Sequence, residues 1–246
     1  MSPTIYADQP AEELPAVRAG RLPDRYAYRM QDVLLERLAP LLVEGVRILD
    51  VGAGRSPTIP PEDRPAGCIY VGTDISAQEL DSAPPGAYDQ TVVQDISASP
   101  GELRDFDLIL TWQVLEHVPN LAAALANLGS ALRPGGVLLA QTSGSYAAFA
   151  VLARVMPHKL RVWAMARFLG HKEEQKFPTH FDRCTEKAIR SMLAGWSSVE
   201  IVTHYRGAPY FSMWGPLRRL YLLYEDAIAR RDAVNLGTHY LIIARR

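Results

Sequence analysis

Short apolar runs rich in β-branched residues recur along the chain, and helical stripes or turns separate them. Five of these runs read as predicted strands: VRILDV (46–51), CIYVGTD (68–74), TVVQD (91–95), FDLILTW (106–112) and VLLAQT (137–142). Runs that are continuously apolar, without alternation, are typical of parallel strands covered on both faces. Strands that alternate with helices predict an open, doubly wound α/β fold.

Apolar residues at three- and four-residue spacing predict the intervening helices. The predicted helices span 26–43, 120–132, 185–195 and 216–230, and two last strands span 198–205 and 238–246. Residues 143–183 break the rhythm and read as two short helices around Met156 and Pro157, followed by a loop. Residues 1–24 hold four prolines and show no period, so we expect a flexible leader before a single domain over 25–246.

Composition indicates an ordinary globular chain. Of its 246 residues 48% are hydrophobic, and the formal net charge of −1 gives no general attraction to nucleic acid. Cys68 and Cys184 lie far apart and match no metal spacing. The N-terminus lacks a secretory apolar core, and no stretch approaches the ~18 apolar residues of a membrane span. We therefore expect a cytoplasmic protein.

The most informative motif is the glycine turn after the first predicted strand, Ile48 to Ser56. Gly52 and Gly54 allow a ligand to approach the backbone at the carboxyl edge of the sheet. Asp74 ends the next strand, twenty residues past Gly54, where a carboxylate can accept hydrogen bonds from both hydroxyls of a ribose. Asp95 ends the third strand and could meet an adenine amino group.

The same segment argues against a dinucleotide. The position of the third glycine in the pattern G-x-G-x-x-G holds Pro57. Four prolines within 55–67 make a long helix there improbable, so a pyrophosphate would lack its usual helix N-terminus. A Walker-type loop ending in Gly-Lys-Ser or Gly-Lys-Thr is absent as well. A nucleoside ligand without phosphate fits this segment better.

Five segments in order resemble the motifs of class I S-adenosylmethionine-dependent methyltransferases, especially their small-molecule branch. They are ILDVGAGRSP, YVGTDIS, VVQDIS, FDLILTWQVLEHVPN and LRPGGVLLAQTS, within residues 26–143. The turn departs from the family pattern because Ser56 replaces its third glycine, and the prolines must shorten the helix that follows. The resemblance implies a Rossmann-like, mostly parallel sheet with an antiparallel last strand and a helical cap inserted after the fifth strand, at about 146–183.

The resemblance also implies the residues that hold S-adenosylmethionine. They are Asp50, Gly52, Gly54, Asp74, Ile75, Asp95, Ile96 and Gln113. Asp50, Gly52 and Gly54 would lie against the methionine part. Asp74 would bind the ribose and Ile75 would lie against the adenine. Asp95 and Ile96 would flank the adenine from the next strand. Gln113 would line the cofactor and face the acceptor. Arg29 could reach the methionine carboxylate, or it is a solvated helix charge.

Methyl transfer from a sulfonium is an in-line displacement that needs no metal, and alignment supplies most of the catalysis. A base helps when the acceptor is a hydroxyl, and His117 and His180 are the candidates. Alternatively, His117 only holds its loop and His180 is a surface histidine. The remaining histidines have no ligand spacing, so we predict no metal site.

Residues 146–176 carry six basic side chains with aromatic residues between them. They form either a cap with a solvated basic face, or a basic, aromatic lid for an anionic or lipid-linked acceptor, or a contact with a membrane surface. The predicted function is methyl transfer to a small molecule. A catalytically weak partner subunit that binds the cofactor and a nicotinamide-dependent oxidoreductase are the alternatives.

Overall fold

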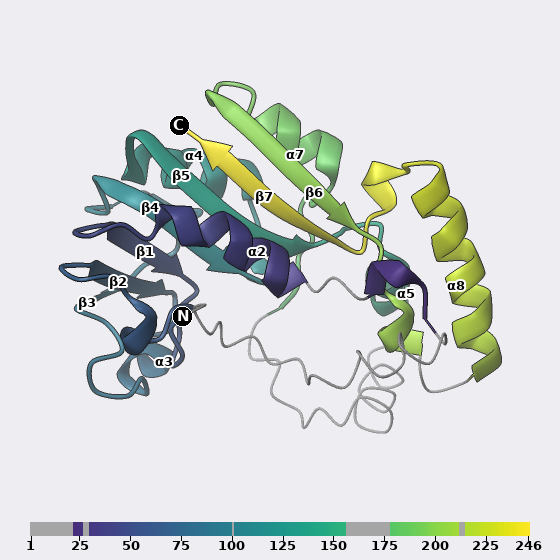
Figure 1. The fold of residues 1–246 in the computed structure, drawn as a ribbon, viewed down its shortest axis with the longest axis horizontal. Coiled ribbons are helices and arrows are strands. Elements are labelled where there is room, and N and C mark those ends of the chain that lie inside the picture. The colour runs from purple at the N-terminus through teal and green to yellow at the C-terminus, as the bar shows by residue number, and fades with distance from the viewer. Residues whose placement is uncertain (1–21, 27–29, 100, 156–177, 212–214) are drawn as a thin grey trace.

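The computed structural model describes residues 22–26, 30–99, 101–155, 178–211 and 215–246, which include a seven-stranded sheet (Figure 1). The strand order is β3-β2-β1-β4-β5-β7-β6, and β7 runs antiparallel to both of its neighbours. The strands are β1 (Arg47–Val51), β2 (Ile69–Asp74), β3 (Gln90–Val93), β4 (Phe106–Trp112), β5 (Leu132–Ser143), β6 (Ser198–His204) and β7 (His239–Arg245). This order confirms the predicted Rossmann-like, mostly parallel sheet with an antiparallel last strand.

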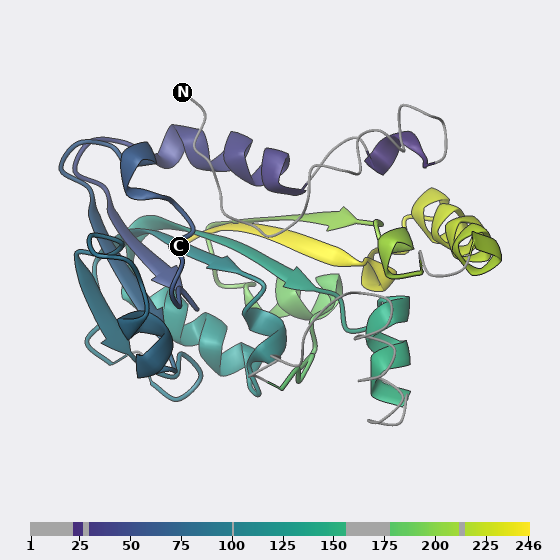
Figure 2. The same cartoon turned by 90° about the horizontal axis from the view of Figure 1, so that it is seen from below.

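Helices cover both faces of the sheet, as the continuous apolar strands predict. In Figure 2, α2 (Met30–Leu38) lies on one face, and α4 (Leu121–Ala131) and α7 (Glu186–Met192) lie on the other. Alternate residues of β1 enter the two cores, since Leu49 packs in the core with α4 and Ile48 in the core with α2. The remaining α-helices are α3 (Ala77–Asp81), α5 (Ala148–Val155) and α8 (Gly215–Arg230). Each described helix is too short or too polar to cross a membrane.

The helix predicted over 26–43 is shorter in the structure. It covers Met30–Leu38, and a 3-10 turn, η2 (Ala39–Leu41), follows it. Pro40 explains the early end, because proline disfavours helical backbone at the residue before it and lacks an N–H to continue the helix. Tyr26 lies in a separate 3-10 turn, η1 (Asp24–Tyr26).

Parts of the predicted organisation fall outside the described residues. These are the leader up to residue 21, Arg29, and the basic and aromatic lid from 156 onward. The division into leader, domain and cap therefore stays a prediction. Within the described ranges, α5 is the helix that follows β5.

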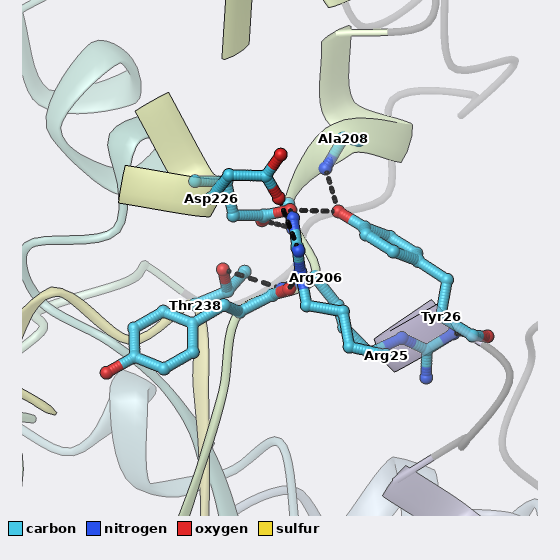
Figure 3. A network of polar contacts seen from close by, with 9 residues as sticks. Arg25, Tyr26, Arg206, Ala208, Asp226 and Thr238 are labelled. Atoms are coloured by element: carbon cyan, nitrogen blue, oxygen red, sulfur yellow. Dashed lines mark hydrogen bonds and ion pairs between the residues drawn. The ribbon is translucent and has the colours of Figure 1, made fainter. Parts of the chain in front are cut away.

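A buried carboxylate fastens η1 to α8. Glu225 is fully buried and accepts hydrogen bonds from the Tyr26 hydroxyl, the Arg25 guanidinium (2.8 Å) and the Gly207 N–H (2.6 Å). The Tyr26 hydroxyl also accepts a hydrogen bond from the Ala208 N–H at 2.9 Å (Figure 3). These contacts join chain segments about 200 residues apart. Beside them, Tyr26, Ala208, Phe211 and Tyr221 form a small third core.

We expect Glu225→Gln to lower the free energy of unfolding by about 3 kcal/mol, because breaking a buried ion pair leaves donors without their charged partner. Asp226→Asn is the matched control. Asp226 also pairs with Arg25 but is partly exposed, so its loss should cost about 1 kcal/mol or less. Urea unfolding measures both values, and equal small losses would contradict the role of Glu225.

Candidate active site

The glycine turn lies directly against the end of β2. The N–H groups of Gly52 and Ala53 both donate to the carbonyl oxygen of Thr73, at 2.8 and 3.1 Å. A Cβ atom added at Gly54 would lie 3.8 Å from Oδ2 of Asp74. The structure therefore brings together the turn and the acid that the sequence paired.

The backbone conformation at both positions of the turn favours glycine. Gly52 has φ 68° and Gly54 has φ 51°, in the left-handed region that side chains disfavour. A Cβ at Gly52 would also lie 2.2 Å from Cγ2 of Val114, so the site has no room for a larger residue there. Close approach between the end of β1 and the loop after β4 depends on this glycine.

Asp74 keeps one carboxylate oxygen available. Its Oδ1 accepts a hydrogen bond from the Ser76 N–H at 2.9 Å, and the described residues donate none to Oδ2. Ile75 beside it is 57% exposed. A polar acceptor and an apolar side chain thus lie next to each other at the end of β2, as a nucleoside requires.

The residues after β3 divide between surface and core. Asp95 is exposed, and its Oδ1 accepts hydrogen bonds from the Ser97 N–H and hydroxyl, both at 2.7 Å. Ile96 is only 6% exposed and packs in the core under α4. Of this pair, Asp95 presents its side chain at the sheet edge, and Ile96 lies beneath it.

Asp50 does not reach the surface of the site. It is 1% exposed, and it accepts hydrogen bonds from the Thr58 N–H (2.7 Å), the Thr58 hydroxyl (2.8 Å) and the Tyr70 hydroxyl (2.7 Å). Burial raises the pKa of Asp50, although these hydrogen bonds oppose the rise. The carboxylate is therefore engaged in fixing the loop that follows the glycine turn.

That loop holds its shape without a long helix, as its prolines predict. Between β1 and β2 its helical structure is one 3-10 turn, η3 (Pro61–Asp63). Arg64 lies over the Tyr70 ring, 3.7 Å from its centroid, and donates to the carbonyl oxygens of Ile59 and Ala87. The Tyr70 hydroxyl in turn accepts from the Ile59 N–H at 3.0 Å. Side-chain hydrogen bonds and a cation–π contact replace the helix.

Tyr88 is a site residue that the sequence reasoning missed. Its hydroxyl lies within hydrogen-bond distance of the carbonyl oxygens of Ala53 (2.8 Å) and Gly54 (3.1 Å) and donates to them, so it holds the turn in place. Its ring occupies the space over Gly72, where a Cβ would lie 2.7 Å from Cδ1. The glycine within YVGTD was the available signal, because a glycine inside a strand often marks a close neighbour.

Gln113 follows β4 with an unusual backbone. Its φ is 56°, and its N–H donates to both the carbonyl and the side-chain Oε1 of Gln141, at 3.1 and 3.0 Å. The Gln113 side chain is exposed. Left-handed backbone at a residue other than glycine is often found at functional sites, where surrounding contacts hold it.

Both candidate histidines lie in one cluster where β4 and β5 end. His117 ends the 3-10 turn η4 (Leu115–His117), and its Nδ1 lies 3.1 Å from the carbonyl oxygen of Pro178. The His180 N–H donates to the carbonyl oxygen of Glu116 at 2.8 Å, while its side chain is exposed. Two segments about 60 residues apart in sequence are thus adjacent here.

The carboxylate of Glu116 anchors this cluster. It is 4% exposed and accepts hydrogen bonds from the hydroxyls of Thr142 (3.1 Å) and Ser143 (2.8 Å). Asp182, near His180, accepts from the Leu121 N–H at the start of α4. Burial raises the pKa of Asp182, but this hydrogen bond and Arg183 outweigh burial and lower it overall. In the described ranges, no three His, Cys, Asp or Glu side chains gather as metal ligands.

Comparison with known proteins identifies the class. Residues 24–195 match the family model described as a methyltransferase domain, so the chain belongs to this methyltransferase family. This confirms the resemblance to class I S-adenosylmethionine-dependent methyltransferases, with S-adenosylmethionine as the cofactor. It also removes the nicotinamide-dependent alternative.

Curated relatives of this chain include O-methyltransferases of ubiquinone biosynthesis. The protein from Mesorhizobium japonicum is 36% identical over 104 residues, which cover 40% of this chain and 41% of that protein. The protein from Methylocella silvestris is 31% identical over 140 residues, 53% of each chain. This chain thus spans about half the length of the curated relatives it matches.

Solved structures share the fold. An S-adenosylmethionine-dependent methyltransferase from Archaeoglobus fulgidus has a TM-score of 0.53 at 16% identity, covering 87% of this chain and 92% of that one. Phosphoethanolamine N-methyltransferase 2 from Haemonchus contortus, in complex with S-adenosyl-L-methionine, has a TM-score of 0.55 at 15% identity, covering 87% of this chain and 51% of that one. At these identities the likeness supports the fold alone.

The Asp50 network gives a prediction for stability and binding. Tyr70→Phe removes a donor from a buried carboxylate and should lower the free energy of unfolding by about 1–3 kcal/mol. It should also weaken binding of S-adenosylhomocysteine, because the loop after the glycine turn loses its anchor. Urea unfolding and titration calorimetry measure the two effects.

Tyr205→Phe serves as the control for this variant. The Tyr205 hydroxyl is buried without a hydrogen-bond partner among the described residues, so its removal should change stability by no more than about 0.5 kcal/mol. If Tyr70→Phe behaves like Tyr205→Phe in both assays, the Asp50 network does not support the site.

Proposed function

We propose that this protein transfers a methyl group from S-adenosylmethionine to a hydroxyl group of a small molecule. The observation that carries the proposal is the position of the glycine turn beside Asp74, where a Cβ atom at Gly54 would lie 3.8 Å from Oδ2, in a chain of the methyltransferase family. The O-methyltransferase names of the curated relatives support oxygen as the acceptor atom. When bound, the cofactor supplies an activated methyl group on a sulfonium.

The residues at the edge fit this cofactor. The free Oδ2 of Asp74 would accept hydrogen bonds from the ribose hydroxyls, and the exposed Ile75 and Asp95 would contact the adenine. The backbone of Gly52 and Gly54 would lie against the methionine part. Asp50 and Ile96 would act indirectly, because both side chains are buried. Gln113, exposed after β4, would separate cofactor and acceptor.

We assign the proton acceptor to His117. The Pro178 carbonyl oxygen can only accept, so a hydrogen bond with Nδ1 places the ring proton on that nitrogen. Nε2 would then keep its lone pair and take the proton of an acceptor hydroxyl. The hydroxyl oxygen would bond to the methyl carbon as the methyl–sulfur bond breaks, with S-adenosylhomocysteine as the leaving group. His180 contributes through its backbone, which holds the segment carrying Pro178 against Glu116.

The acceptor would have an apolar portion and could be lipid-linked or anionic. Four residues in and before α5, just past the end of β5, are large, apolar and exposed: Tyr146, Val151, Leu152 and Val155. An apolar surface beside the reacting edge suits an acceptor of this kind. Turnover with methyl-labelled cofactor and a panel of hydroxylated apolar compounds tests the function, with mass spectrometry of the products. Cofactor binding without any turnover would favour the partner-subunit alternative.

Asp74→Ala should weaken S-adenosylhomocysteine binding about ten- to a hundredfold, since a charged hydrogen-bond acceptor contributes about 1.5–3 kcal/mol. Asp81→Ala is the matched control, because Asp81 is an exposed acid at the end of α3. Titration calorimetry measures both affinities. Equal affinity in the two variants would exclude Asp74 from the cofactor site.

His117→Ala should lower turnover roughly 10²–10⁴-fold without changing cofactor affinity, as expected for loss of a general base. His180→Ala should stay near the wild-type rate, because its backbone contact is retained. Near-normal rates in both variants would mean that alignment alone drives the transfer.

A further inference from the structure

Helix α8 has two different faces. Tyr221, Glu225 and Ile228 are buried, and the Tyr221 ring stacks on Phe211 with centroids 4.3 Å apart. The outward face instead exposes large apolar side chains: Leu220 at 65%, Leu223 at 66% and Tyr224 at 38%. Their spacing of three and four residues places them side by side on one helix surface.

Arginines flank this apolar stripe. Arg219, Arg230 and Arg231 are exposed, and none of them forms an ion pair with a described residue. The two acids of the helix are engaged elsewhere, since Glu225 is buried and Asp226 pairs with Arg25. The outer face of α8 is therefore an apolar centre with a basic rim.

The helix is held firmly in place. Glu225 and Asp226 bind Arg25 of η1, and Glu225 binds the Gly207 N–H. The third core joins α8 to α5, which follows the carboxyl end of β5. Figures 1 and 2 both show the two helices at the same end of the sheet. Helix α8 thus lies at the same end of the sheet as α5, the helix beside the proposed acceptor surface.

We propose that the outer face of α8, formed by Arg219, Leu220, Leu223, Tyr224 and Arg230, docks the protein on an anionic lipid surface. An interfacial helix buries leucines at the boundary of the acyl chains, with tyrosine and arginine near the headgroups. Anionic phosphates complement a rim that holds guanidinium groups. A second copy of the chain fits less well, because a two-fold contact through this face would bring the arginine rims together.

This inference deepens the proposed function, because an acceptor with a lipid tail would be met at that surface. The docking face involves other residues than the cofactor site, so vesicle binding is measured separately from cofactor binding and turnover. Flotation with vesicles of phosphatidylcholine containing phosphatidylglycerol measures docking directly. We expect the full chain to float with these vesicles, to float far less with phosphatidylcholine alone, and to lose binding as salt rises.

Two variants with matched controls test the face. Leu220→Ser with Leu223→Ser should weaken vesicle binding about tenfold or more, because two apolar side chains that docking would bury in the membrane are lost. Arg219→Glu should weaken it at least about fivefold, the effect of one surface charge near an anionic membrane. Val43→Ser and Arg104→Glu are the controls, since both residues are exposed and lie before β1 and β4, at the opposite edge of the sheet.

The controls should bind as the wild type does, and all four variants should retain circular dichroism and S-adenosylhomocysteine affinity. No flotation of the wild type, or equal flotation of the leucine variant, would overturn the proposal. Concentration-dependent dimers in sedimentation, lost in the leucine variant and accompanied by no vesicle binding, would assign the face to a second copy instead. Flotation without turnover of any acceptor would leave the docking intact and refute the proposed function.

Discussion

The carboxyl edge of the sheet depends on buried carboxylates whose oxygens must accept hydrogen bonds. A charge removed from water is costly unless hydrogen bonds replace its solvation. Asp50 meets this constraint with Thr58 and Tyr70, Glu116 with Thr142 and Ser143, and Glu225 with Arg25, Tyr26 and Gly207. Each carboxylate joins segments that no regular element would hold together.

Two of these buried carboxylates have the same kinds of hydrogen-bond partners. Asp50 and Glu225 each accept from a tyrosine hydroxyl and a backbone N–H, and an arginine lies over the ring of that tyrosine. Asp50 fixes the proline-containing loop after β1, and Glu225 fixes the short N-terminal segment on α8. Neither segment contains a long helix, so side-chain hydrogen bonds supply the order that helical hydrogen bonds would otherwise give.

Strands and turns could be predicted because their signals are local. Continuous apolar runs placed the strands, and Gly52, Gly54 and Asp74 could be paired because parallel strands end at one edge. The buried role of Asp50 could not be predicted, since it depends on a hydrogen bond from the hydroxyl of Tyr70 in the neighbouring strand β2. Tyr26 and Tyr88 were missed for the same reason, because their partners lie far away in sequence or across a loop.

The buried carboxylates stabilise two separate parts of the carboxyl edge of the sheet, so the residues of one part can change without disturbing the other. Asp50 and Tyr88 act on the turn between β1 and β2, where the cofactor would bind. Glu225 acts on α8 and the third core, which reaches the start of α5. Glu116 lies between them. Its carboxylate accepts a hydrogen bond from Ser143 at the end of β5, and its carbonyl oxygen accepts one from the N–H of His180. Changes to the outer surfaces of α5 and α8 therefore leave the hydrogen bonds around the glycine turn untouched. If these surfaces meet the acceptor as proposed, acceptor choice would change without loss of the cofactor site.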